Sequence, residues 1–124
     1  MTIDATDQAL LDRLFAAIDR MDVAGFVDCL TEDATFRFGS APAAAGRDAI
    51  STAVRGFFET IHGLQHALHK AVRHDDTLVC EGEVTYTRHD DSTITLPFAN
   101  VFEMAGGTIA RYKIYMDIGP LYAG

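Results

Sequence analysis

The sequence has no tryptophan, only two cysteines and three prolines, and few basic side chains. Ten Lys and Arg residues stand against 18 Asp and Glu residues, which gives a formal net charge of −8 at pH 7. A surface of this sign repels nucleic-acid phosphates and anionic lipid headgroups, so we expect neither nucleic acid nor a membrane as a partner. Because Cys29 and Cys80 are isolated among apolar neighbours, we expect buried free thiols rather than a disulfide.

Long hydrophobic runs and targeting signals are also missing. No apolar run approaches the roughly 18 residues that a membrane span needs. The N-terminal segment MTIDATDQALL has no basic flank, unlike a secretory signal peptide, so we expect a cytoplasmic protein. Glycine patterns for dinucleotides, P-loops and GxSxG serine elbows are absent as well. Cofactor-free chemistry is therefore the kind of catalysis that we expect, if the protein is an enzyme.

The 124 residues do contain an apolar pattern that changes its period once. The length and the 48% hydrophobic content predict one folded domain over residues 1–124. Up to about residue 63 the apolar side chains recur at helical spacing. This spacing predicts a helix capped at Thr6, a second capped at Asp22 and a third after Gly46. A short strand is expected over 34–38, and a loop over 41–46.

Beyond residue 63 apolar and polar residues alternate, which predicts strands near 64–73, 77–88, 93–104 and 108–117. The breaks between them are short and rich in turn formers, so consecutive strands should pair as antiparallel hairpins. Helices followed by a meander indicate an α+β class. We expect a cone-shaped, curved antiparallel sheet with three N-terminal helices that enclose a hydrophobic pocket. A second copy of the chain would cover the outer face, as in a homodimer.

Two polar side chains fall on otherwise apolar faces. Asp19 follows Phe15 by four residues, at the inner edge of the apolar stripe of the first helix, where it needs a donor or a cation. His66 alternates with Leu64, Leu68 and Val72 in the strand near 64–73. If the two residues meet, the carboxylate fixes the imidazole tautomer and leaves the other ring nitrogen as a base. The pattern also allows a solvated Asp19 and a hydrogen-bonded core histidine.

Three histidines, His62, His66 and His69, lie close together in the sequence. A helix would present all three on one face, as a metal site requires. A strand instead places His66 and His69 on opposite faces, so we expect no metal site.

The strand near 77–88 has two candidate inner faces. One face carries Leu78, Cys80, Val84 and Tyr86, and the other carries Val79, Glu81, Glu83, Thr85 and Thr87. Periodicity does not choose between these two faces. In the following strands, Leu96, Phe98 and Asn100 share one face, as do Tyr112, Ile114 and Met116.

The order of these segments resembles the nuclear transport factor 2-like superfamily, in its SnoaL-like branch. The resemblance is carried by AIDRMDVAGFVDCLTEDATF, by GRDAI and by the closing IARYKIYMDIGPLYA, and it covers about residues 7–123. It implies a curved antiparallel sheet with three helices around a hydrophobic pocket, and commonly a dimer through the outer sheet face. It also places Val84, Tyr86 and Tyr115 on that outer face. Its implied pocket residues are His66, Glu83, Thr85, Thr87, Leu96, Phe98, Asn100, Tyr112, Ile114 and Met116.

Three subfamilies of enzymes in this superfamily can be compared with the chain. The positions that match the base, the tyrosine and the acid of ketosteroid isomerase are Phe38, Leu14 and Asn100 (or Ala99). Those that match the Asp–Arg–Asp set of limonene epoxide hydrolase are Thr85, Glu83 and Ile114. Neither set is retained. The Asp–His pair of scytalone dehydratase and hexachlorocyclohexane dehydrochlorinase is similar to Asp19 and His66, with His62 as a rival for the histidine.

The sequence thus predicts a cofactor-independent acid–base enzyme, a lyase, an isomerase or a polyketide-cyclase-like protein, acting on a small hydrophobic carbonyl or hydroxy compound. His66 would take a proton, Asp19 would orient it, and Glu83 would be a second acid–base group. Asn100 and Tyr112 would donate hydrogen bonds to an oxyanion. The expected substrate-binding set is Phe36, Phe38, Thr85, Phe98, Asn100, Tyr112, Ile114 and Met116. Two alternatives stay open: a non-catalytic ligand-binding or dimerisation domain, and an epoxide hydrolase-like enzyme in which Glu83 activates water.

Overall fold

The structure is a computed structural model, in which residues 3–123 are described. Two helices precede the first strand, and a third follows the second strand. The elements are α1 (Ala5–Asp19), α2 (Val23–Val27), β1 (Leu30–Phe38), β2 (Ala44–Ala45), α3 (Arg47–Glu59), β3 (Gly63–His74), β4 (Thr77–Thr87), β5 (Thr93–Ala105), β6 (Thr108–Tyr115) and α4 (Gly119–Ala123). The four long strands begin and end within two residues of their predicted bounds.

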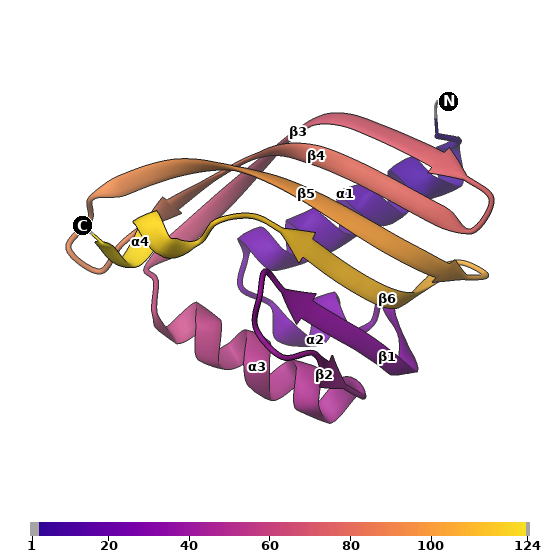
Figure 1. Ribbon diagram of the computed structural model, residues 1–124, viewed down its shortest axis with the longest axis horizontal. Helices are drawn as coiled ribbons and strands as arrows, with labels where there is room; N and C mark the ends of the chain where they lie inside the picture. Colours follow the sequence, from indigo (N-terminus) through magenta and orange to yellow (C-terminus); the bar gives the residue numbers. More distant parts are fainter. Residues whose placement is uncertain (1–2, 124) are drawn as a thin grey trace.

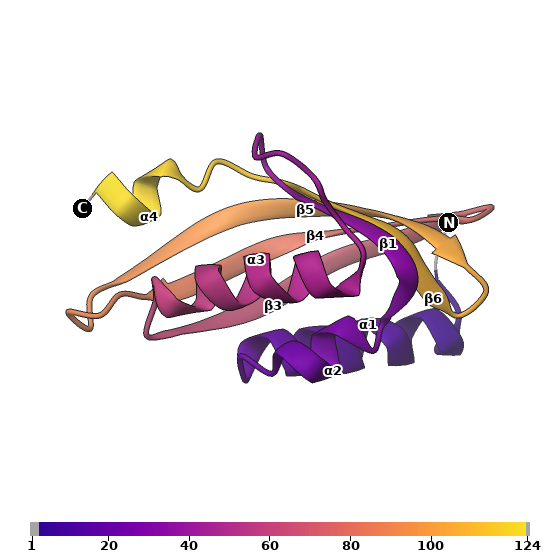
Figure 2. The same cartoon turned by 90° about the horizontal axis from the view of Figure 1, so that it is seen from below.

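The strands form one open sheet in the order β2-β1-β6-β5-β4-β3. The meander from β3 to β6 is antiparallel, as predicted, but β1 runs parallel to β6, so the sheet is mixed. The sheet is strongly curved, and α1, α2 and α3 all lie on one side of it (Figures 1 and 2). The α+β class is therefore confirmed, with the cone-like shape of a curved sheet that wraps over helices.

Acidic residues fix the starts of the first two helices. The Asp4 carboxylate accepts a hydrogen bond from the Asp7 backbone N–H at 2.8 Å, so Asp4, and not Thr6, is the N-cap of α1. The predicted cap of α2 is confirmed, because Asp22 accepts from the Gly25 N–H at 3.0 Å. The segment expected as a loop over 41–46 contains β2, a short strand that pairs with β1.

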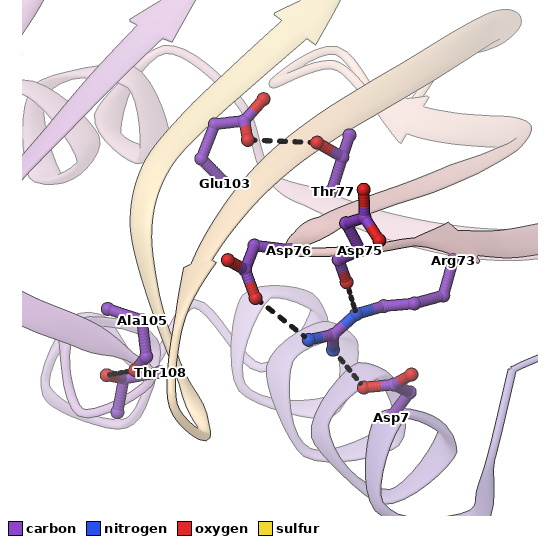
Figure 3. Close-up of polar contacts among 8 residues, drawn as sticks. All are labelled: Asp7, Arg73, Asp75, Asp76, Thr77, Glu103, Ala105 and Thr108. Atoms are coloured by element: carbon purple, nitrogen blue, oxygen red, sulfur yellow. Dashed lines mark hydrogen bonds and ion pairs between the residues drawn. The ribbon is translucent and has the colours of Figure 1, made fainter.

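The N-terminal half of α1 is held against β3 by a buried ion pair (Figure 3). Arg73 Nη1 lies 2.7 Å from Asp7 Oδ1, and the Asp7 side chain is only 8% exposed. A β-bulge between Leu68 and Lys70 shifts the register of β3 by one residue, which turns Arg73 toward the helices. The expectation that Val72 shares a face with Leu64 was therefore wrong, because the bulge reverses the alternation.

The core lies between the helices and the concave face of the sheet. Leucine and isoleucine side chains from α1, β1, α3, β4 and β6 are fully buried there, among them Leu11, Leu14, Leu30, Ile50, Leu78 and Ile109. No helix of residues 3–123 has the length and the hydropathy to cross a bilayer. None of α1, α2 and α3 lies on the opposite face of the sheet (Figure 2). The homodimer that would cover this face stays a prediction.

Candidate active site

A cavity of about 290 Å³ lies between the sheet and the helices. This volume is near the lower end of the roughly 300–1,000 Å³ typical of small-molecule pockets. Within residues 3–123, the wall of this cavity contains no carboxylate and no lysine or arginine. Its polar side chains are His66, Asn100 and three tyrosines. The predicted residues that line it are Phe36, Phe38, His66, Phe98, Asn100, Tyr112, Ile114 and Met116. The part that each plays in binding stays a prediction.

One residue of the cavity wall, His66, is paired with an aspartate that lies behind it. Asp19, the last residue of α1, lies beside His66 of β3, which is 47 positions away in the chain. The Oδ1 atom of Asp19 lies 2.6 Å from Nδ1 of His66, and its Oδ2 atom accepts a hydrogen bond from the His66 backbone N–H at 3.0 Å. Because one carboxylate binds both ring and backbone, the ring has a single favoured orientation.

The imidazole is also held by aromatic packing. Its centroid lies 4.8 Å from that of Phe15 and 5.2 Å from that of Phe98, and the side chain is 11% exposed. With Nδ1–H donated to the carboxylate, Nε2 carries the lone pair. No hydrogen bond to Nε2 occurs among residues 3–123. The ring nitrogen that can act as a base is therefore the one left for a ligand in the cavity.

The other two histidines of the predicted cluster lie elsewhere. His62 is exposed and packs against His89, with ring centroids 6.4 Å apart, and it does not line the cavity. His69 Nε2 lies 3.7 Å from Glu83 Oε1 on the outer face of the sheet. Asp19 therefore pairs with His66 and not with the rival His62. No group of three His, Cys, Asp or Glu side chains suitable for a metal ion occurs among the described residues.

The predicted assignment of the two faces of β4 was wrong. Gly82 lies opposite Phe98 and Val84 lies opposite Leu96, so the even-numbered residues of β4 share the cavity face with these two. Val84 and Tyr86 therefore line the cavity, while Glu83 and Thr85 point away from it. The apolar residues of β4 take the buried face, as the hydrophobic effect favours.

Glu83 and Thr85 consequently lose their predicted places in the site. The Glu83 side chain is 52% exposed and lies beside His69. The Thr85 hydroxyl shares a hydrogen bond with Thr95 at 2.9 Å, also on the outer side. Neither residue reaches the cavity, so neither can serve there as an acid–base group or a substrate contact.

Tyr86 is a cavity residue that the sequence reasoning missed. It is 2% exposed, and its hydroxyl donates to the Met116 sulfur at 3.8 Å. Burial raises the pKa of this phenol well above its usual value, and Tyr122 nearby raises it further. The ordinary rule that an apolar strand face is buried would have found it.

Asn100 and Tyr112 form a second polar group in the wall. Asn100 is 2% exposed, and its Nδ2 lies 3.5 Å from the Tyr112 hydroxyl. Its Oδ1 has no hydrogen-bond partner among residues 3–123. Burial raises the pKa of Tyr112 well above its usual value. Burial also raises the pKa of the adjacent Cys80 to about 12, so this thiol stays protonated and is a poor nucleophile.

Comparisons with known proteins point to one family and to structures of the same fold. A family model described as a SnoaL-like domain matches residues 11–112, and none of the curated protein sequences is significantly similar to the chain. An NTF2-like protein from Burkholderia pseudomallei superposes with a TM-score of 0.85 at 16% identity, covering 95% of each chain. TerC, crystallised with polyporic acid, gives a TM-score of 0.83 at 17% identity, covering 95% of this chain and 96% of its own.

A proposed SnoaL-like polyketide cyclase from Jannaschia sp. CCS1 is also similar. Its TM-score is 0.82 at 15% identity, with 98% of this chain and 92% of that chain covered. At such identities these three structures establish a shared fold, on which unrelated functions occur.

Proposed function

The chain belongs to the SnoaL-like domain family, and from this premise we propose that it is a cofactor-independent acid–base enzyme. It acts as a lyase, an isomerase or a polyketide-cyclase-like protein on a small hydrophobic carbonyl or hydroxy compound. The observation that carries the proposal is that His66, in the wall of an apolar cavity, is paired with Asp19. The similar polyketide cyclase fold supports it at the level of the family.

The reaction begins at Nε2 of His66. This nitrogen takes a proton from the carbon next to the carbonyl group of the substrate, which leaves an enolate and an imidazolium. Asp19 then lies 2.6 Å from a positively charged ring, which it stabilises. Return of the proton to another carbon gives an isomerase, loss of a leaving group gives a lyase, and attack on a second carbonyl gives a cyclase. All three outcomes share the first proton transfer.

The first proton transfer can be measured without knowing the substrate. 2-Tetralone is a small bicyclic ketone with acidic C–H groups beside its carbonyl, and its size suits the cavity. In D₂O, the protein should accelerate exchange of these protons for deuterium, followed by proton NMR. His66→Gln should reduce the exchange rate by about 10²–10⁴-fold, the usual contribution of a general base.

A matched control separates His66 from histidines in general. His69→Gln makes the same chemical change on the outer face, where the side chain is 54% exposed, and should exchange like the wild type. Equal exchange by wild type and His66→Gln, with both proteins folded, would contradict the proposal. Binding of 2-tetralone without accelerated exchange would favour the alternative, a domain that binds hydrophobic ligands without catalysis.

The epoxide hydrolase-like alternative has less support. It needs a carboxylate that activates water inside the cavity, and Glu83 was its candidate. Because Glu83 lies on the outer face and the described wall contains no carboxylate, nothing in the cavity fills that role.

A further inference from the structure

The Tyr86 hydroxyl in the cavity wall donates only to a weak acceptor. A buried phenol normally finds an oxygen acceptor. Tyr86 has only the Met116 thioether, at 3.8 Å, and a thioether sulfur is a weak acceptor. An oxygen atom of a ligand would be a better partner, and the cavity leaves room for one.

Tyr86 and His66 reach into the cavity from neighbouring strands. In the β3–β4 ladder Tyr86 lies opposite Leu64, and His66 lies opposite Val84, two positions along. Residues related in this diagonal way share a face, with Cα atoms about 7–8 Å apart. A ligand oxygen bound by Tyr86 is thus on the same wall as the imidazole.

The surroundings of Tyr86 favour an uncharged oxygen. No lysine or arginine in the described residues lines the cavity, and the protein carries a net charge of −8. An anionic ligand would therefore lose its hydration without gaining a fixed cation. Burial also keeps the phenol protonated, because its pKa is raised, so Tyr86 acts as a donor and not as an acceptor of a ligand proton.

We propose that the Tyr86 hydroxyl binds the carbonyl oxygen of the ligand, so that the pocket selects apolar compounds with an uncharged ketone or aldehyde group. The inference rests on the proposed function for the reaction at His66 and adds the residue that recognises the substrate's oxygen. Ligand binding displaces the contact between Tyr86 and Met116. The carbonyl carbon then lies between the donor and the neighbouring carbon that His66 deprotonates.

The experiment compares two probes of the same shape. 2-Tetralone carries the carbonyl oxygen, and 2-methylenetetralin replaces that oxygen with a CH₂ group. Their dissociation constants are measured for the wild type and for Tyr86→Phe by calorimetry. The preference for the ketone over its CH₂ analogue, given by the ratio of the two dissociation constants, should fall by about two- to tenfold in Tyr86→Phe. This is the usual effect of one lost hydrogen bond. The infrared carbonyl band of bound 2-tetralone should lie at lower frequency in the wild type than in Tyr86→Phe.

Met116→Leu distinguishes ligand recognition from a structural role of the Tyr86–Met116 contact. It removes the sulfur acceptor and keeps the Tyr86 hydroxyl, with little change in side-chain volume. If Tyr86 binds the ligand, Met116→Leu alters the lining and so changes both dissociation constants together, but it keeps the ratio between the two probes and the low-frequency carbonyl band. If it instead shifts the ratio as Tyr86→Phe does, the hydroxyl serves the protein fold and the inference is overturned.

Two further results would also overturn the inference: an unchanged ratio in Tyr86→Phe, and a carbonyl band that does not differ between the two proteins. Failure of the proposed function looks different. In that case 2-tetralone shows no accelerated deuterium exchange, while the carbonyl shift and its loss in Tyr86→Phe remain.

Discussion

Replacing Asp19 with asparagine tests how the site sets the protonation of His66. The carboxylate makes two contacts, one with Nδ1 of the ring at 2.6 Å and one with the His66 backbone N–H at 3.0 Å. Both contacts need an acceptor, and an asparagine offers only one. In the first orientation its oxygen accepts from the backbone, and its NH₂ group faces Nδ1. The ring must then carry its proton on Nε2, so the lone pair is on Nδ1 and no longer faces the cavity.

The second orientation of the amide is also unfavourable. The asparagine oxygen would accept from Nδ1–H, but the NH₂ group would then face the His66 backbone N–H, and both are donors. A backbone donor left without a partner in this half-buried place costs about 1–3 kcal/mol. We therefore expect the first orientation, with the wrong tautomer.

The expected consequences are a large loss of rate and a small loss of stability. Deuterium exchange of 2-tetralone should fall by about 10²–10⁴-fold, because general-base catalysis of this size depends on the lone pair at Nε2. Loss of a charge-assisted hydrogen bond should lower the free energy of unfolding by about 1–2 kcal/mol.

The tautomer can be observed directly. Long-range ¹H–¹⁵N correlation spectra distinguish the protonated from the unprotonated ring nitrogen of the neutral imidazole. The wild type should show His66 protonated at Nδ1, and Asp19→Asn should show it protonated at Nε2. Asp12→Asn, on the exposed side of α1, makes the same change away from the site and should behave as the wild type. An Asp19→Asn protein that keeps the Nδ1–H tautomer and the wild-type exchange rate would refute this reasoning.

Two further predictions concern the stability of the fold that positions the site. Arg73→Met leaves the Asp7 carboxylate buried without its cation, so chemical denaturation should show a loss of about 2–3 kcal/mol, a little below the usual cost for a fully buried pair. The added change Asp7→Asn should recover most of this loss, and an additive double variant would contradict the ion-pair explanation. A Cβ atom at Gly82 would overlap the Ala67 carbonyl oxygen, so Gly82→Ala should cost more than about 3 kcal/mol. Gly107→Ala, with open space around its Cβ, should stay within about 0.5 kcal/mol of the wild type, and equal melting of the two variants would show that the close approach is unimportant.

The helices and long strands could be predicted because their signals are local. Apolar residues at helical spacing mark α1 and α3, and alternation between turn-rich breaks marks β3 to β6. The parallel pairing of β1 with β6 could not be predicted in this way. It joins segments about 75 residues apart, and no pattern within either strand shows which strand is its neighbour. The bulge after Leu68 was missed for a related reason, since one extra residue in a strand has no marked sequence signal.

The Asp19–His66 pair shows where prediction from sequence can reach a site. Each residue was conspicuous because it is a polar side chain on an otherwise apolar face. A polar side chain in such a place needs a partner, and the two satisfy each other. The pattern showed that each needed a partner, but it could not show that the partners were one another, because helix packing on the sheet decides that.

The error on β4 has consequences for the chemistry. With Glu83 and Thr85 inside, the cavity would hold a second acid–base group, and a water-activating carboxylate would be available. With Val84 and Tyr86 inside, the described wall offers one imidazole, that of His66, and two phenols that burial keeps protonated, those of Tyr86 and Tyr112. One base that both takes and returns a proton suits enolisation, a proton shift along a carbon chain, or ring closure through an enolate. Hydrolysis needs an activated water and a group that holds it. The corrected assignment of the two faces of β4 therefore favours proton transfer at carbon over the addition of water.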